Sequence, residues 1–329
     1  MEKMQMAEMI EEESSGFKRT VSARIPEELQ GTRLDSTLSV LFPDRSRSFW
    51  QTRLESGDVA LDGVTVTKAG KKGKTGQMLC VTVPKAEEAQ ILPEQIPLDI
   101  LYEDDDLIVV NKPKGMVVHP APGHSSGTLV NALMYHCRDS LSGINGVLRP
   151  GIVHRIDRNT TGSLVIAKND MAHEHLARQF KAHSINRSYR AILHGNLLKD
   201  EITVDAPIGR HPKDRMRMAV LNGGHGTSRR AVTHVKVLER FGDYTYVECV
   251  LETGRTHQIR VHMSYIGHPV LGDDTYGPRR CPFRLEGQTL HAMILGFIHP
   301  STGEYLECTA PLPEYFERLL MQLRRNLGK

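Results

Sequence analysis

The arrangement of apolar runs between residues 98 and 329 constrains the fold more than any other feature of the sequence. Short runs typical of buried strands, such as LIVVNKP (107–113) and LHAMILGFIHP (290–300), outnumber the segments with helical spacing. The two kinds do not alternate strictly, as they would in a doubly wound fold. The sequence therefore predicts an α+β domain with a mixed, largely antiparallel sheet, in which 231–241 and 244–252 form an antiparallel pair.

Four segments of this region have the apolar spacing of helices. They are TLVNALMYHC (128–137), DMAHEHLARQFKAHSI (170–185), THQIRVHMSYIG (256–267) and PEYFERLLMQLRR (313–325). We expect Thr256 to cap the third of them. Strands are expected in 188–195, and a strand followed by a loop in GMVVHPAPGHSSG (115–127).

The first part of the chain predicts a separate small domain. The acidic residues 1–16 are interpreted as a disordered tail, and 85–97 as a linker, leaving a module at 17–84 and the larger domain at 98–329. Helices are expected in TRLDSTLSVLF (32–42) and SRSFWQTRLESG (46–57), followed by a hairpin around Asp62-Gly63 and a strand at 78–83. Through RLD, SRS and GDVALDG the module resembles the alpha-L RNA-binding module; the alternative is a basic accessory domain.

Positive charge is concentrated in places, although the net charge is only +3. Clusters of this kind are the usual footprint of phosphate binding, although ordinary solvated faces also carry them. The candidate RNA-binding residues are Arg45, Arg47, Lys71, Lys72, Lys74, Arg210, Lys213, Arg215 and Arg217.

The stretch GIVHRIDRNTTGSLVIAKND (151–170) places charged residues between two apolar runs. Asp157 is expected in an exposed turn, ionised and held so by Arg155 and Arg158, since a nearby opposite charge favours the carboxylate. Thr160 and Thr161 are expected to bind the local backbone. The pattern leaves open whether Asp157 is reactive or belongs to a structural ion pair.

Two further residues are candidates for the same site. Arg255, in ETGRTHQIRVHM, precedes a predicted helix, and Tyr189, in NRSYRAIL, begins a predicted strand. Spacing alone favours the plainer interpretation, in which Arg255 pairs with Asp157 in a salt bridge and Tyr189 is an ordinary core residue.

Several motifs in one order change this interpretation. GIVHRIDRNTTGSLVIAKN, VVNKPKGMVVHP, SYRAI, APIGRHPKDRMRMAV, TGRTHQIRVHM and LHAMILGFIHP together closely resemble the RluA/RluD family of RNA pseudouridine synthases over residues 17 to 325, and more closely its RluD-like branch. The resemblance implies a pseudouridine synthase domain with a central active-site cleft. Ile156, Thr161 and Ser163 depart from the usual motif without removing a residue that the chemistry needs.

The resemblance also implies roles. Asp157 would be the catalytic carboxylate, acting on the ribose carbon, on the base or in an elimination. Arg255 would pair with it, Tyr189 would lie against the target base and help to remove the proton at carbon five, and Arg155 would enter the RNA stack as the uridine leaves. His154 is assigned no role beyond shaping the turn.

The remaining expectations concern partners and location. The resemblance implies an isomerase that needs no cofactor or metal and acts on structured RNA, either ribosomal RNA of the large subunit or a ribosomal precursor particle. We expect a cytoplasmic monomer without a membrane span. The alternatives are a non-catalytic RNA-binding or ribosome-assembly protein, and the same chemistry on transfer RNA.

Overall fold

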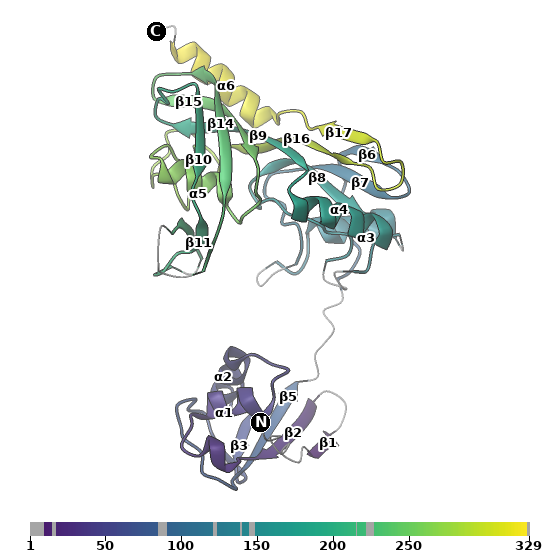
Figure 1. The fold of residues 1–329 in the computed structure, drawn as a ribbon, viewed down its shortest axis with the longest axis vertical. Helices are drawn as coiled ribbons and strands as arrows, with labels where there is room; N and C mark the ends of the chain where they lie inside the picture. The colour runs from purple at the N-terminus through teal and green to yellow at the C-terminus, as the bar shows by residue number, and fades with distance from the viewer. Residues whose placement is uncertain are drawn as a thin grey trace. The chain divides into compact units, whose positions relative to one another are not determined.

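The computed structural model describes residues 10–14, 18–84, 91–120, 124–138, 140–144, 149–214, 216–221 and 227–327. The chain divides into two compact units, Met1–Ala89 and Gln90–Lys329 (Figure 1). Among the described residues, no helix is long and apolar enough to cross a membrane.

The smaller unit contains a five-stranded sheet in the order β1-β2-β5-β3-β4 and two helices. Its elements are β1 (Ile10–Ser14), β2 (Lys18–Arg24), the 3-10 helix η1 (Glu27–Leu29), α1 (Leu34–Leu41), α2 (Arg47–Glu55), β3 (Val59–Leu61), β4 (Val64–Thr65) and β5 (Met78–Pro84). The two predicted helices and the hairpin are confirmed. Asp62 and Gly63 both have positive φ, as the tight turn between β3 and β4 requires.

Two expectations at the ends of this unit are changed. Residues 10–14 form strand β1 against β2, where we predicted a disordered tail; residues 1–9 and 15–17 lie outside the described residues. Of the expected linker, 85–90 also lies outside them, whereas Ile91 packs into the core of the larger unit. Backbone pairing and apolar burial are long-range contacts, which local composition does not reveal.

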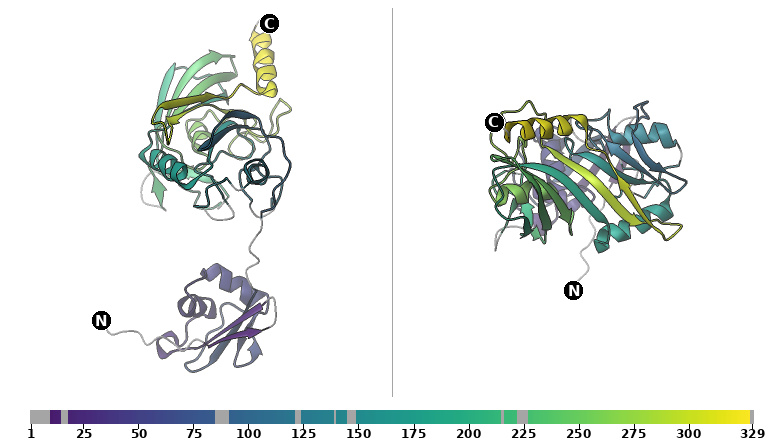
Figure 2. Two further views of the ribbon diagram at one scale, coloured as in Figure 1. Left: turned by 90° about the vertical axis from the view of Figure 1, so that its right-hand side faces the viewer. Right: turned by 90° about the horizontal axis from the view of Figure 1, so that it is seen from above.

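The larger unit is built on a nine-stranded sheet in the order β10-β14-β15-β9-β16-β8-β7-β6, with β17 paired to β16. Its strands are β6 (Ile100–Glu103), β7 (Leu107–Lys112), β8 (Thr161–Ala167), β9 (Asn186–His194), β10 (Glu201–Asp205), β14 (Val232–Arg240), β15 (Tyr244–Leu251), β16 (Leu290–Ile298) and β17 (Tyr305–Thr309). The β8–β16 pair is parallel and the other pairs are antiparallel, which confirms the predicted α+β class. Figure 2 shows the twist of this sheet.

Helices cover both faces of the sheet. They are α3 (Leu129–Cys137), α4 (Asp170–Ala182), α5 (Gln258–Tyr265) and α6 (Glu314–Leu327), and all four were predicted. Alternate residues of β7 and β8 pack on α3 and on α4, while α6 packs against β9 and β15 (Figure 1). No strand forms in the described part of 115–127, of which 121–123 lies outside the description; that prediction is wrong for the residues described.

A small three-stranded sheet stands apart from the main one. It consists of β11 (Ile208–Arg210), β12 (Met218–Val220) and β13 (Ser228–Arg229). The basic segment 210–217 is the loop of the β11–β12 hairpin.

Candidate active site

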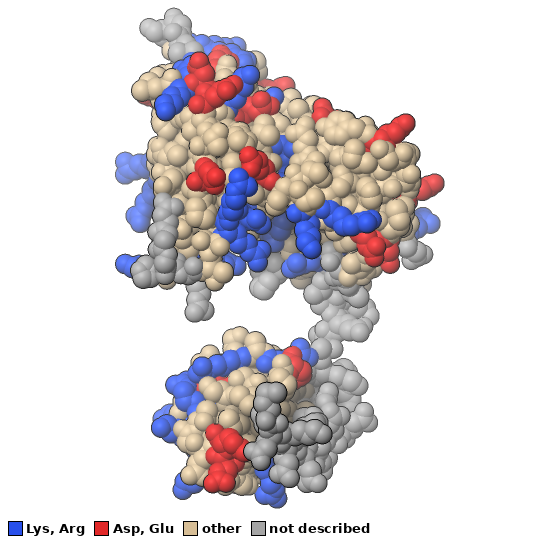
Figure 3. All heavy atoms as spheres, in the orientation of Figure 1, with Lys and Arg blue, Asp and Glu red and all other residues tan. Residues whose placement is uncertain are grey.

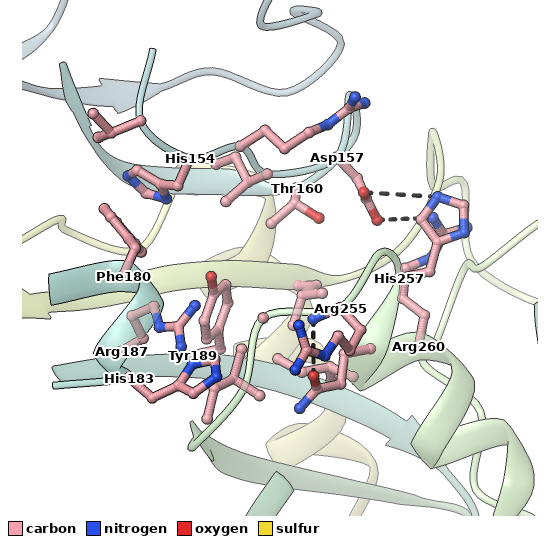
Figure 4. A pocket seen from close by; sticks show the side chains of 18 of the residues that line it. His154, Asp157, Thr160, Phe180, His183, Arg187, Tyr189, Arg255, His257 and Arg260 are labelled. Atoms are coloured by element: carbon pink, nitrogen blue, oxygen red, sulfur yellow. Dashed lines mark hydrogen bonds and ion pairs between the residues drawn. The ribbon is translucent and has the colours of Figure 1, made fainter. Parts of the chain in front are cut away.

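A pocket of about 500 Å³ opens in the larger unit (Figure 4). Its walls come from residues 153–160, the end of α4, the start of β9, the loop before α5 and the first turn of α5. Pockets for small molecules commonly measure roughly 300–1,000 Å³, so it has room for a nucleoside. Arg155, Asp157, Tyr189 and Arg255, far apart in sequence, all line it.

The turn that carries Asp157 is anchored on both sides. Before it, Ile152 forms a bridge to Ile166 of β8, and Ile156 is buried in the core. Within it, the Thr160 amide donates to the Asp157 carbonyl oxygen at 3.0 Å. The side chain of Asp157 keeps 20% of its surface exposed, so it reaches both the pocket and the groups that hold it.

The fully buried Lys112 stabilises this turn through hydrogen bonds to backbone carbonyl oxygens. Lys112 Nζ donates to the carbonyl oxygens of Pro113 at 2.8 Å, Met116 at 2.9 Å and Arg158 at 3.0 Å, so each of the three ammonium N–H groups has an acceptor. Burial lowers the pKa of Lys112 to about 7, and the charge of Asp157 acts in the opposite direction. Lys112 thereby ties the residue after Asp157 to the loop 113–116.

The hydroxyls that follow the turn do not bind the local backbone as predicted. The Thr161 hydroxyl is hydrogen-bonded to Nδ1 of His291 at 2.8 Å, and the Thr160 hydroxyl accepts from Nε2 of Gln288 at 3.0 Å. Gly162 has a φ of +109°, and a Cβ there would lie 2.2 Å from the Ala292 carbonyl oxygen. The close pairing of β8 with β16 therefore requires the glycine.

Asp157 is held by Arg260, which the sequence did not single out. Arg260 Nη1 donates to Asp157 Oδ2 at 2.9 Å, and its Nε and Nη2 donate to Asp273 at 2.6 and 2.9 Å. His257 Nε2 lies 3.7 Å from Asp157 Oδ1 (Figure 4). One guanidinium thus joins the pocket carboxylate to a second carboxylate in the interior.

The Arg260–Asp273 ion pair is buried. The side chain of Arg260 is 7% exposed and that of Asp273 is fully buried. Burial by itself would lower the pKa of Arg260, but its hydrogen bonds and charge pairing with Asp273 and Asp157 outweigh that effect and raise the pKa. Arg260 is therefore a permanent cation hydrogen-bonded to Asp157 Oδ2.

The partners predicted for Asp157 are elsewhere. Arg255 Nε donates to the Arg230 carbonyl oxygen at 3.0 Å, and Arg158 Nε to the Gly115 carbonyl oxygen at 3.0 Å. Arg155 Nη1 lies 3.5 Å from His119 Nε2. Within the described parts of the chain none of these three arginines forms an ion pair with Asp157, so the expected Arg255–Asp157 pair is wrong.

The start of α5 explains the change of partner. Helix α5 begins after His257, which has a φ of 58°, so Thr256 is not its cap. Gln258 Oε1 accepts from the Arg255 amide at 2.9 Å and so closes the loop. This geometry places His257 and Arg260, rather than Arg255, beside Asp157.

Tyr189 is a core residue that also lines the pocket. It belongs to the main core cluster and is 9% exposed, yet its ring lines the pocket (Figure 4). Burial raises the pKa of its hydroxyl, the charge of Arg187 opposes that shift and the charge of Asp157 adds to it. The phenol is therefore protonated at neutral pH.

His154 shapes the turn as expected. Its Nε2 accepts from the Val165 amide at 3.1 Å, and its ring stacks on Phe180 with centroids 4.4 Å apart. Burial, together with the charge of Arg187, lowers the pKa of His154 to about 3. It is a neutral structural residue.

The candidate RNA-binding residues of the smaller unit differ in how free their charges are. Lys71, Lys72 and Lys74 are exposed. Arg47 pairs with the buried Asp35 at 2.9 Å, so part of its charge is neutralised. Arg45 lies near Asp44, at 3.6 Å, and over the Phe49 ring.

In the larger unit, the hairpin between β11 and β12 exposes Arg210 and Lys213. Arg217 lies over the ring of Tyr276, 5.2 Å from its centroid, and Arg215 lies outside the described residues. Figure 3 shows Lys and Arg side chains gathered on one face of the larger unit.

One group of metal-type side chains occurs away from the pocket. Oxygen or nitrogen atoms of Asp104, Asp106 and His299 lie within 4.8 Å of one another. His299 Nε2 is hydrogen-bonded to Asp104 at 2.7 Å, and the Tyr102 hydroxyl donates to the same carboxylate. These groups satisfy one another.

Sequence reasoning missed Lys112, Arg187 and Arg260. Each is a cation inside an otherwise buried run, at the end of LIVVNK, in NRSYRAIL and in QIRVHM. A charge at such a position needs a partner or a function, and that signal could have identified all three.

Comparisons with known proteins agree with this geometry. Residues 106–265 match the family described as RNA pseudouridylate synthase. The chain is 55% identical to an uncharacterized RNA pseudouridine synthase of Bacillus subtilis, over 91% of this chain and 97% of that one. It is 46% identical to ribosomal large subunit pseudouridine synthase D of Zymomonas mobilis, over 93% of this chain and 99% of that one. The structure of human RNA pseudouridylate synthase domain containing 1 superposes with a TM-score of 0.55 at 29% identity, covering 70% of this chain and 96% of that one.

Proposed function

Since this chain belongs to the family of RNA pseudouridine synthases and is an isomerase that converts uridine in RNA to pseudouridine, we propose that Asp157 carries the reaction and that large-subunit ribosomal RNA is the substrate. The isomerisation breaks the bond from ribose to N1 of uracil and forms one to carbon five. Carbon five loses a proton and N1 gains one, so the reaction is redox-neutral.

The observation that carries the assignment is the setting of Asp157. It is the one carboxylate among the described residues that line the pocket, and Arg260 donates a hydrogen bond to it that fixes its position. An ionised carboxylate fixed at a partly exposed position can reach a bound nucleoside without losing its orientation. Its remaining 20% exposure is the surface available to substrate.

Tyr189 and Arg155 support the same proposal. The Tyr189 ring offers a flat apolar surface in the pocket, against which a uracil can lie. Arg155 is exposed at the rim, where its guanidinium can replace part of the stacking that a flipped uridine loses, which is worth roughly a few kcal/mol.

The choice of ribosomal RNA rests on the relatives. The synthase of Zymomonas mobilis is named for the large ribosomal subunit, and this chain covers nearly all of it. Exposed basic residues on both units, including Lys72 and Lys213, suit the phosphates of a structured RNA. We also propose that the enzyme works as a monomer in the cytoplasm.

Asp157→Asn tests the chemistry. Since carbon five loses its hydrogen, RNA labelled with tritium at that carbon releases the label as pseudouridine forms. Wild-type protein should release tritium from large-subunit ribosomal RNA, and the variant should bind that RNA with unchanged affinity but release none. Retained release would remove Asp157 from the mechanism.

Chemical mapping of pseudouridine in total RNA, with and without the gene, tests the substrate. Loss at a few large-subunit positions is the expected result. Losses confined to transfer RNA would keep the chemistry and reject the ribosomal assignment. Unchanged RNA, together with an inactive purified protein, would favour the non-catalytic RNA-binding alternative.

A further inference from the structure

Arg187, in β9, is a buried cation that forms no ion pair with a carboxylate of the described residues. It is 7% exposed, and its Nε and Nη2 have no hydrogen-bond partner among the described residues. Its guanidinium lies over the ring of Phe180, with Cζ 5.8 Å from the ring centroid. An uncompensated buried charge is costly in free energy, so a buried cation usually has an anionic partner, either in the protein or in a bound ligand.

The pocket wall around Arg187 is cationic. Lys181, at the end of α4, and Arg255 also line the pocket, and neither forms an ion pair with a carboxylate in the parts of the chain that the structure describes. Asp157, the only carboxylate of the described lining, already pairs with Arg260. Burial lowers the pKa of nearby His183, and the charges of Arg255 and Arg187 lower it further.

Gly254 makes room for this guanidinium. A Cβ at position 254 would lie 2.5 Å from Arg187 Nη1 and 3.5 Å from its Cζ, although the backbone there has no left-handed φ. The glycine is therefore required by space beside the cation rather than by a turn. It lies in the same loop as Arg255, which brings the second guanidinium to the same wall.

We propose that Arg187, together with Arg255 and Lys181, forms a phosphate-binding subsite that holds a backbone phosphodiester next to the target uridine. The inference rests on the proposed function for its ligand, RNA. Guanidinium groups form directional, charge-assisted hydrogen bonds to phosphate oxygens, and an RNA phosphate brings the missing negative charge. The phosphate would fix the position of the flipped nucleotide while Asp157 acts on it from the opposite wall.

Inorganic phosphate tests the subsite without any need for catalysis. The full chain is titrated with phosphate at constant ionic strength, and its thermal midpoint is compared between wild type, Arg187→Met and Arg187→Lys, with Arg178→Met as the control. Arg178 is an exposed α4 arginine that does not line the pocket, so this variant removes the same charge elsewhere. Ligand that binds only the folded state raises the midpoint.

Phosphate should raise the midpoint of wild type, Arg187→Lys and Arg178→Met, and the response of Arg187→Met should be about tenfold weaker in apparent affinity. Without phosphate, Arg187→Met should be at least as stable as wild type, because an unpaired charge has been replaced by an apolar side chain. A marked loss of stability with an unchanged phosphate response would make Arg187 structural and overturn the subsite. Equal responses in all four proteins would mean that phosphate binds as an adventitious ion only, which would also overturn the subsite.

RNA binding provides the second arm. Arg187→Met should weaken binding of large-subunit ribosomal RNA and reduce the slope of log affinity against log salt by about 0.7, the value for one phosphate of a single strand. An unchanged slope with a lower turnover at saturating RNA would assign Arg187 to the base or to Tyr189 instead. Failure of wild type to convert any RNA would reject the proposed function, and the phosphate titration would still decide whether the anion site exists.

Discussion

Replacing Arg260 tests which arginine holds the pocket carboxylate. In Arg260→Met, the fully buried Asp273 loses hydrogen bonds of 2.6 and 2.9 Å and keeps only backbone donors, and Asp157 loses its bond of 2.9 Å. Breaking a buried ion pair by removing one partner costs about 3–5 kcal/mol. Most of that cost should come from Asp273, because Asp157 is one-fifth exposed and retains water.

Arg255→Met is the matched control. Arg255 is partly exposed and makes one side-chain hydrogen bond, to a carbonyl oxygen, so its loss should lower the free energy of unfolding by about 1 kcal/mol or less. Turnover should fall about a hundredfold in Arg260→Met, since an unheld Asp157 shifts relative to the nucleoside.

Urea unfolding followed by circular dichroism measures the stability change. Trp50, the single tryptophan of the sequence, is buried in the core of the smaller unit, so its fluorescence reports that unit and should not change. Tritium release from RNA measures turnover. A loss below about 1 kcal/mol in Arg260→Met, or a larger loss in Arg255→Met, would refute the reasoning.

Three further predictions concern the turn, the pH response and the smaller unit. Lys112→Met should lower the free energy of unfolding by about 3 kcal/mol or more, because three carbonyl oxygens lose a charged donor; unfolding in urea measures this, and a loss near zero would mean that the turn does not depend on Lys112. Between pH 6.5 and about 3, His154 is protonated in the unfolded chain but not in the folded protein. This residue therefore lowers the free energy of unfolding by about 1.4 kcal/mol for each unit by which the pH is lowered. His154→Gln should remove that part of the slope in unfolding experiments at several pH values, and an identical slope would contradict the assignment. Changing Lys71, Lys72 and Lys74 together to Ala should weaken RNA binding and flatten its salt dependence by about 0.7–0.9 per lost phosphate contact; equal slopes would show that these lysines do not touch RNA.

The elements of the fold were largely readable from the sequence. Periodic apolar spacing located α3, α4, α5 and α6, and continuous apolar runs located the central strands, because both patterns arise from burial of one or two faces of a local element. The strand β1 and the packing of Ile91 were not readable, since each depends on residues distant in sequence.

The residues of the candidate site also divide into those that the sequence singled out and those that it did not. Motifs in one order indicated the family, which is confirmed, and through that resemblance singled out Asp157, Tyr189 and Arg255 as candidates, all of which line the pocket. Arg260, 103 positions after Asp157, was not identified as its partner. That pairing depends on the left-handed backbone at His257, which sets where α5 begins.

The sequence by itself determined the class of fold, through the spacing of its apolar residues, and the chemistry, through the resemblance of its ordered motifs to a known family, which also singled out Asp157 as the candidate carboxylate. Only the tertiary structure decided which cation holds that carboxylate and which one, Arg187, has no carboxylate partner among the residues that the structure describes. The physical reason is that a charge pair requires two side chains to meet within about 4 Å, a distance that depends on how distant segments pack and not on either segment alone.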